Sequence, residues 1–306
     1  MKEATTDRKP RRGTLRGVAA RRRRVAYGLL TPGGLYLFAA LLLPLGIMIY
    51  TSLKSGGLLS GGFSFEWPGD WSNYADALTQ YPTQFTRSII YAGIATLSAI
   101  ILAYPMMYWI AFKGGRWKAS LLLLILLPFF VSYVVRTVQW KWILADNGML
   151  LGTLKDLGVL PDDFSILATP TAVIAGLTYD FVPFVALPLF VSLDRIHPSL
   201  IEAAEDLFAT PWTAFRKVVF PLSIPGVFAA LILSFVPMAG DYVNPEILGG
   251  PDTQMIGNVI QYKFLTAADY PMGSALSVIL MIGMVILASI YAKILGTEEA
   301  TNMAAA

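Results

Sequence analysis

Two carboxylates stand beside aromatic side chains in stretches of the chain that are otherwise apolar. Asp180 follows Tyr179, and Asp241 precedes Tyr242. A carboxylate and an aromatic face both attract an organic cation, and an ionisable side chain inside an apolar segment is a candidate functional group. Arg136 is a third such group. A structural role is the alternative, because Asp180 could accept a hydrogen bond or pair with Arg136, and Asp241 lies near the end of its segment.

A polar stretch between two apolar segments predicts two short helices joined by a turn. Ser199, followed three residues later by Glu202, has the spacing of a capping box, which predicts that the first helix begins there. Thr210 and Pro211 suit the N-cap and first turn of the second helix. Pro221 is expected to end it.

Several classes of chemistry are excluded by composition. The chain has no cysteine and one histidine, which excludes disulfides, thiolate nucleophiles and any metal site built on two histidines. It has no Gly-Lys pair, so it lacks a phosphate-binding P-loop. We therefore expect no catalytic site, no metal and no cofactor of its own, and the chain does not look like an enzyme.

The composition is that of a membrane protein. Hydrophobic residues make up 56% of the chain and charged residues 14%, with a mean hydropathy of +0.60. Residues 1–24 carry ten Lys/Arg against two acidic residues. Such a tail could bind nucleic acid, but a long apolar segment follows directly, which favours a cytoplasmic anchor beside anionic lipid and no nucleic-acid partner.

Six stretches are long and apolar enough to cross a membrane. They are residues 28–52, 87–112, 119–139, 169–193, 222–242 and 275–295. The predicted fold is an all-α membrane protein with six transmembrane helices. Its parts are a basic tail (1–27), a transmembrane domain (28–296) and a short tail (297–306).

Loop charges predict the orientation of these spans. The tail and the loop 113–118 are basic, whereas the longer loops 53–86, 140–168 and 243–274 are richer in acidic residues. The positive-inside bias therefore places both termini and residues 194–221 in the cytoplasm. That last connection is far longer than the 2–8 residues usual in helical bundles, which indicates a docking role.

The polar stretch resembles a sequence pattern of the transmembrane subunits of bacterial ABC importers. The pattern reads Glu-Ala-Ala, three residues, Gly, nine residues, Ile-x-Leu-Pro, and it corresponds here to Glu202, Ala203, Ala204, Phe208, Val218, Phe220 and Pro221. The spacing is kept, but Phe208 replaces glycine. Because phenylalanine does not adopt a positive φ as readily as glycine, the pattern leaves the geometry of the turn open, and Ala209 is a second small residue available for close packing.

Three further segments resemble the spermidine/putrescine permease subfamily. They are Tyr179–Leu189, Pro128–Gly148 and Gly240–Asn258. The likeness covers nearly everything after about residue 28. The chain is similar to the longer, basic-tailed first permease of the pair of permeases in polyamine importers.

The resemblance implies a permease subunit with the type I ABC importer fold in the bacterial inner membrane. The implied partners are a second, different permease subunit, two ATPase subunits that bind the ATP, and a periplasmic or lipid-anchored binding protein that delivers a small molecule. The residues it implies for ATPase coupling are Glu202, Ala203, Ala204, Asp206, Ala209 and Pro221. For Glu202, helix capping is the alternative role. The candidate substrate pathway is chosen from the ionisable and aromatic residues of the spans and not from the resemblance, and it contains Asp180, Tyr179, Asp241, Tyr242 and Arg136.

Two alternatives remain open from the sequence. The permease could carry another small solute, such as ferric iron, an opine or an aminophosphonate, because those permeases share the pattern. A secondary transporter that works without an ATPase is a different class. It would predict inverted repeats and a relay of buried ionisable groups, and neither is visible.

Overall fold

Helices dominate the structure, because in lipid the backbone amides and carbonyls must be satisfied within the chain. The computed structural model describes residues 12–57 and 62–304. The chain divides into two units, Met1–Thr51 and Ser52–Ala306.

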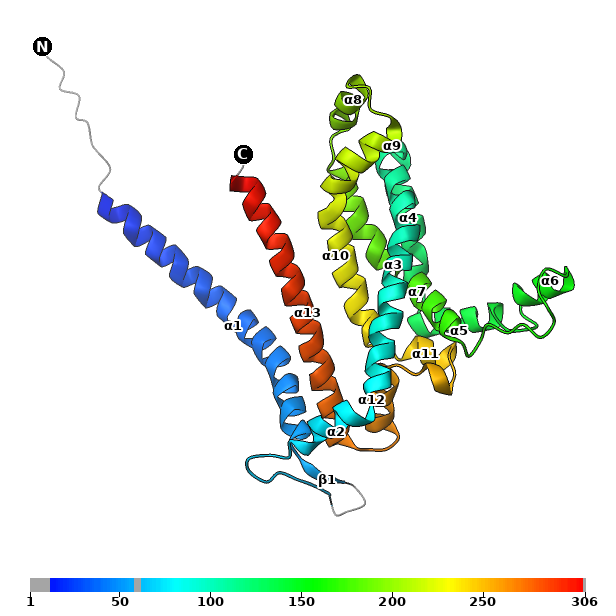
Figure 1. Cartoon of the computed structure of the whole chain (residues 1–306). Coiled ribbons are helices and arrows are strands. Elements are labelled where there is room, and N and C mark those ends of the chain that lie inside the picture. The colour runs from blue at the N-terminus through cyan, green and yellow to red at the C-terminus, as the bar shows by residue number, and fades with distance from the viewer. Residues whose placement is uncertain (1–11, 58–61, 305–306) are drawn as a thin grey trace, which may run out of the picture. The chain divides into compact units, whose positions relative to one another are not determined.

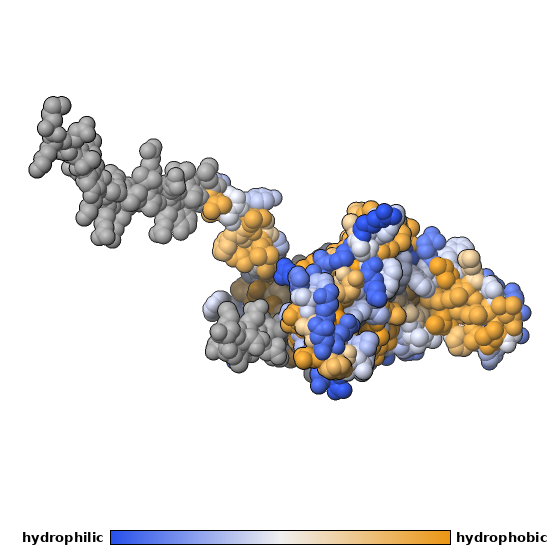
Figure 2. All heavy atoms as spheres, turned by 90° about the horizontal axis from the view of Figure 1, so that it is seen from above, coloured by the Kyte–Doolittle hydropathy of each residue, from blue (hydrophilic) through white to orange (hydrophobic). Residues whose placement is uncertain are grey.

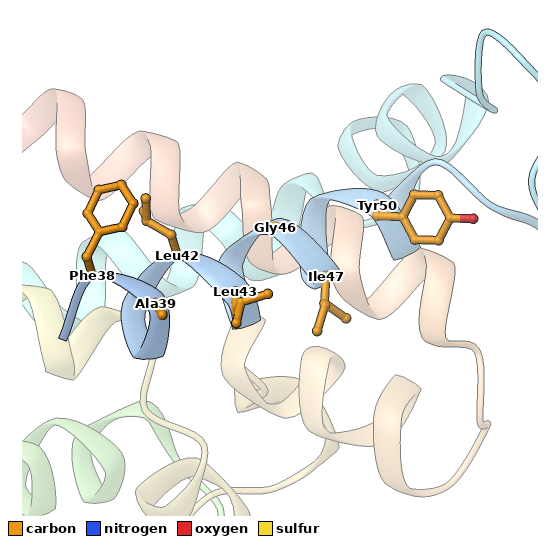
Figure 3. Close-up of a pocket in the computed structure, with 7 residues that line it drawn as sticks. All are labelled: Phe38, Ala39, Leu42, Leu43, Gly46, Ile47 and Tyr50. Carbon is orange, nitrogen blue, oxygen red and sulfur yellow. The ribbon is translucent and has the colours of Figure 1, made fainter. Parts of the chain in front are cut away.

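The first unit consists of the helix α1 (Arg12–Ser52) up to the unit boundary. Its part Leu30–Ser52 is long and apolar enough to cross a membrane. Residues 1–11 of the predicted basic tail lie outside the described residues. One face of α1 carries a shallow apolar hollow, which Figure 3 shows in close-up and which is lined by Phe38, Ala39, Leu42, Leu43, Gly46, Ile47 and Tyr50. No ionisable acid or base lines it apart from the tyrosine, which suits contact with lipid or with another helix.

The second unit begins with a small antiparallel hairpin and continues as helices (Figure 1). Up to its first long helices it contains β1 (Ser55–Gly57), β2 (Gly62–Ser64), α2 (Ser72–Gln80), α3 (Pro82–Lys113), a 3₁₀ turn (Gly115–Trp117), α4 (Lys118–Leu126), a second 3₁₀ turn (Leu127–Phe130), α5 (Tyr133–Ile143), α6 (Leu151–Asp156) and α7 (Pro170–Asp194). There follow α8 (Pro198–Asp206), α9 (Pro211–Ala214), a π-helical turn (Phe215–Val219), α10 (Phe220–Ala239), α11 (Val243–Ile247), a third 3₁₀ turn (Pro251–Thr253), α12 (Ile256–Leu265) and α13 (Tyr270–Ala304).

The core of this unit lies where α3, α7 and α10 pack side by side (Figure 1). Small residues recur along the buried face of α3: Ala95, Ala99 and Ala103 are all fully buried. Helices in membranes gain little from hydrophobic burial against one another, so close backbone approach over small residues is a main source of packing. Leu189 of α7 and Val219 before α10, both fully buried, belong to the same cluster.

Among the described residues, five helices are long and apolar enough to span a membrane, and a bent pair can supply a sixth span. The predicted all-α membrane fold is confirmed. The expectation of a single helix over 119–139 is wrong, because Gly115–Phe130 and Tyr133–Ile143 meet at 90°. Pro128 lacks the amide hydrogen that would continue the helix, and Val131 adopts an extended conformation with ψ of 143°.

Candidate functional site

The predicted docking loop lies at one end of the second unit, beyond the ends of α7 and α10, whereas α11 and α12 lie toward the other end (Figure 1). Hydrophilic residues gather near the centre of the face that is seen from the α8 end (Figure 2). The loop exposes the carboxylates of Glu202 and Asp206 together with the apolar side chains of Leu207, Phe208 and Trp212.

The expected capping box at Ser199 is wrong. The helix α8 begins one residue earlier, with Pro198 in its first turn and His197 as N-cap. The His197 Nδ1 accepts a hydrogen bond from the Ser199 amide at 3.4 Å and lies 2.8 Å from the Ser199 Oγ. Glu202 lies too far inside the helix to cap it. Its side chain is exposed and makes no hydrogen bond or ion pair with any residue that the structure describes.

The turn after α8 keeps the left-handed conformation that glycine usually supplies. Phe208 has a φ of +60°. Its amide donates to the Glu205 carbonyl at 2.9 Å, and the Ala209 amide donates to the Ala204 carbonyl at 3.0 Å. These two bonds are a Schellman motif. Phe208 therefore adopts the left-handed conformation usual for glycine: the hydrogen bonds hold the residue in place, and its side chain is 97% exposed.

The second helix of the loop begins as predicted but does not end at Pro221. The Thr210 Oγ1 accepts a hydrogen bond from the Thr213 amide at 3.3 Å, with Pro211 in the first turn. The helical run then continues to Ala239. A π-helical turn, in which the Phe220 amide donates to the Phe215 carbonyl, precedes Pro221 and lets the run pass the proline.

The six residues implied for ATPase coupling differ in exposure. Glu202, Ala203, Asp206 and Pro221 are exposed, whereas Ala204 and Ala209 are half-buried. Ala204 and Ala209 are joined by the Schellman hydrogen bond. The exposed residues of α8 give this helix an acidic surface that a partner could reach.

Aromatic side chains connect the loop to the core. Trp212 stacks on Phe215 at a centroid distance of 5.3 Å, and Phe215 contacts Tyr104 and Tyr108 of α3 edge-on, each at 5.8 Å. The Tyr104 hydroxyl lies 2.7 Å from the Ser223 Oγ of α10. The loop is therefore joined to α3 and α10 through packed rings and a hydroxyl contact.

The predicted pathway residues Arg136 and Asp180 form a buried ion pair. The Arg136 Nε donates to the Asp180 Oδ1 at 2.5 Å, and the two side chains are 8% and 0% exposed. The Thr137 hydroxyl and the Asn244 amide donate to the Asp180 Oδ2 at 3.1 and 3.2 Å. Arg136 also donates to the Pro128 carbonyl at 3.0 Å. The structural alternative for Asp180 is thus present in the geometry.

Asp241 belongs to the same cluster. It accepts hydrogen bonds from the Tyr133 hydroxyl at 2.7 Å and from the Asn244 side chain at 3.0 Å. The backbone amides of Val243 and Asn244 also point to it, at 3.0 and 3.3 Å. The cluster joins α5, α7 and α11, and both its carboxylates are satisfied by neighbours.

The two predicted tyrosines lie outside this hydrogen-bonded cluster. Tyr179 packs on Trp140 at 5.0 Å, with its ring 5.9 Å from the Arg136 guanidinium. Tyr242 is 44% exposed, and its carbonyl accepts a hydrogen bond from Asn258. A hollow of about 540 Å³ adjoins the ion pair, and its lining includes Phe129, Tyr133, Arg136, Asp180, Phe181 and Phe184.

Sequence reasoning missed three members of the cluster. Tyr133 precedes Arg136 by three residues in α5, and Asn244 follows Asp241 by three residues at the start of α11. This spacing from an ionisable residue already chosen was the available signal for both, whereas Thr137 only directly follows Arg136. Within the described ranges, no group of three or more histidine, aspartate or glutamate side chains could hold a metal ion.

Comparisons with known proteins give a consistent family. A family model described as "Binding-protein-dependent transport system inner membrane component" matches residues 85–297. The spermidine/putrescine transport system permease protein PotB of Salmonella typhimurium (strain SL1344) is 36% identical over 220 residues, which is 72% of this chain and 77% of the relative. PotC of Escherichia coli K12, a permease protein of the same kind of system, is 27% identical over 80% of this chain and 86% of the relative.

A solved structure supports the fold. A bacterial alginate ABC transporter, in complex with a periplasmic protein that holds an alginate pentasaccharide, contains a chain that aligns with a TM-score of 0.71 at 15% identity. The alignment covers 89% of this chain and 93% of that one.

Proposed function

Because the chain belongs to the family of inner-membrane components of binding-protein-dependent transport systems, we propose that it is the permease subunit of an ATP-driven importer for the polyamines putrescine and spermidine. The observation that carries the substrate is the 36% identity to PotB over 220 residues. The alginate transporter is too distant in sequence to inform the substrate and supports the fold alone.

The proposal includes three kinds of partner. A second permease subunit, similar to PotC, completes the membrane pathway. Two ATPase subunits bind ATP and hydrolyse it, since the chain itself has no P-loop. A periplasmic or lipid-anchored binding protein delivers the substrate. Both termini and the loop 194–221 face the cytoplasm in this arrangement, with residues 1–27 and 297–306 as flanking tails.

Coupling is assigned to the loop 194–221. The exposed carboxylates of Glu202 and Asp206 suit a groove with basic side chains, because charge-assisted hydrogen bonds are among the stronger polar contacts. The small side chains of Ala203 and Ala204 let a partner approach the helix closely, Ala209 lies in the turn that follows it, and Pro221 lies at the beginning of α10. The aromatic contacts of Phe215 then carry the motion of the ATPase subunits into α3 and α10.

The substrate pathway is proposed to pass the cluster that contains Asp180, Asp241 and Arg136, with Tyr179 and Tyr242 beside it. Two carboxylates against one guanidinium leave an excess of negative charge, which favours a cation. The hydrogen bonds within the cluster support an additional role for it in holding α5, α7 and α11 together.

The test is uptake of radiolabelled putrescine and spermidine by cells that carry the complete transporter and lack other polyamine uptake. Uptake that requires an active ATPase subunit supports class and substrate together. ATPase-dependent uptake of a different solute, without polyamine uptake, would show that the substrate is another small solute, such as ferric iron, an opine or an aminophosphonate. Polyamine uptake that does not require ATPase activity overturns the proposal of an ATP-driven importer in favour of a secondary transporter.

A further inference from the structure

A polar hollow separate from the buried cluster lies between the beginning of α3, α11 and α12. Its volume is about 400 Å³. It is lined by Tyr81, Gln84, Glu246, Gln254, Asn258, Val259, Gln261, Tyr262 and Thr266. Glu246 is the single charged side chain in this lining. The other polar members carry amide or hydroxyl groups, so the hollow offers hydrogen-bond acceptors and donors around one negative charge.

Gln84 has a buried acceptor without a donor. Its Oε1 is buried and has no hydrogen-bond partner among the described residues. A buried amide oxygen that lacks a donor is unfavourable, and most such atoms in folded proteins are satisfied by a neighbour, a water molecule or a ligand. Gln84 therefore leaves an uncompensated acceptor behind the lining, where its partial negative charge adds to that of Glu246.

Glu246 is oriented and still has room to bind. The Asn258 amide donates to the Glu246 Oε2 at 3.2 Å and to the Tyr242 carbonyl at 2.9 Å. The Asn258 Oδ1 in turn accepts from the Met255 amide at 3.1 Å. One carboxylate oxygen is therefore held in place, whereas the other makes no hydrogen bond within the part of the chain that the structure describes. By contrast, both carboxylates of the buried cluster are engaged.

Two tyrosine rings add the aromatic faces that suit an organic cation. Tyr262 is 55% exposed, and Tyr81 already lies near a cation, with the Lys263 Nζ 6.0 Å from its ring centre. That lysine is paired with Asp269 at 2.8 Å. Burial alone would lower the pKa of Lys263, but Asp269 and Tyr81 together raise it above its ordinary value. Lys263 thus stays charged and is balanced by Asp269, which leaves Glu246 uncompensated.

We propose that this hollow binds a primary ammonium group of an alkyl polyamine, with Glu246 as the charged acceptor and the rings of Tyr81 and Tyr262 against the methylene chain. A primary ammonium carries three N–H donors, which matches a site built from separate acceptors. This site rests on the proposed polyamine function. It adds a second position, outside the buried cluster, at which the transporter binds the polyamine.

The direct test uses the absence of cysteine from the chain. Gln254 is an exposed lining residue, so Gln254→Cys places a single thiol at the hollow. In the complete transporter, putrescine is expected to slow modification of this thiol by a neutral thiol reagent about tenfold, whereas 1,4-butanediol, which has the same chain length without charge, leaves the rate unchanged. Adding Glu246→Gln should reduce the protection to less than about twofold, because one lost charge contact of about 1.4 kcal/mol corresponds to tenfold in affinity.

The matched control is Asp252→Asn, which removes an exposed carboxylate of the same region that does not line the hollow. Protection that survives Glu246→Gln, or that is lost equally with Asp252→Asn, overturns the site. The protection experiment and the uptake assay can fail independently of each other. Uptake of polyamine without protection refutes this site and keeps the proposed function, and protection without uptake keeps the site and refutes the function.

Discussion

The buried ion pair between Arg136 and Asp180 predicts a large and unequal response to substitution. Asp180→Asn leaves a guanidinium, which cannot lose its proton, buried without its ion-pair partner, and removing one partner of such a pair costs about 3–5 kcal/mol. Arg136→Met leaves a carboxylate that keeps its hydrogen bonds from Thr137 and Asn244 and can take up a proton. We therefore expect a loss near the lower end, about 3 kcal/mol.

The double variant Arg136→Met/Asp180→Asn removes both charges and should lie within about 1 kcal/mol of the unaltered protein, because well-packed neutral groups often replace a buried pair without loss. The assay is unfolding of the purified chain by SDS in mixed micelles, with membrane abundance measured in parallel. A coupling free energy of at least about 3 kcal/mol is expected. Single substitutions whose effects simply add, within about 0.5 kcal/mol, would refute the claim that the two residues act as one unit.

Uptake measured with the same variants distinguishes a purely structural role of the two charges from a role in the substrate pathway. If the double variant regains stability and also transports polyamine, Asp180 serves only to hold the helices. If it regains stability but fails to transport, the charges of this cluster take part in the passage of the substrate.

Three further predictions concern the loop and the α12 end. Glu202→Arg should abolish ATP-dependent uptake at unchanged membrane abundance, because it reverses the charge on the exposed face of α8. The control Asp163→Arg, in a distant exposed loop, should leave uptake unchanged. Normal uptake by Glu202→Arg would exclude the coupling role. Phe208→Gly should relieve a left-handed strain of about 1–2 kcal/mol, seen as slower hydrogen exchange in the turn, and faster exchange would mean that the exposed ring stabilises the turn. The pKa of Lys263 is raised above 10.5 by its contacts. The pair with Asp269 should therefore stabilise the fold below this pH and lose that contribution as the pH rises through the raised value, so Lys263→Met should flatten the alkaline part of a pH–stability profile.

Features of the structure that depend on local sequence were largely predictable. The spans followed from the length of apolar stretches, and the N-cap at Thr210 followed from its position before Pro211. The start of α8 was misjudged because Pro198 already suits the first turn, so His197 and not Ser199 becomes the cap. At Pro221 the local rule failed, because a π-helical turn changes the hydrogen-bond spacing just before the proline.

Contacts between distant residues were beyond local rules. The charges of Arg136 and Asp180 suggested a pair, but nothing in the sequence placed Tyr133 against Asp241, a contact across 108 positions. The role of Glu246 was likewise hidden, because its orientation depends on Asn258 and on a hollow that forms only when α3, α11 and α12 come together.

The break between the 3₁₀ turn and α5 and the buried ion pair form one arrangement. The Pro128 carbonyl at the break accepts a hydrogen bond from the Val131 amide at 3.1 Å, and the Arg136 guanidinium donates to the same oxygen at 3.0 Å while its Nε pairs with Asp180. One side chain thus binds the backbone at the bend and neutralises the carboxylate of α7. Because an unpaired carboxylate is costly in a membrane, and its counter-charge is held by the carbonyl at the bend, the bend and the contact between α5 and α7 stabilise each other. A conformational change that separates α5 from α7 must therefore also release the bend, which makes these segments a single moving part.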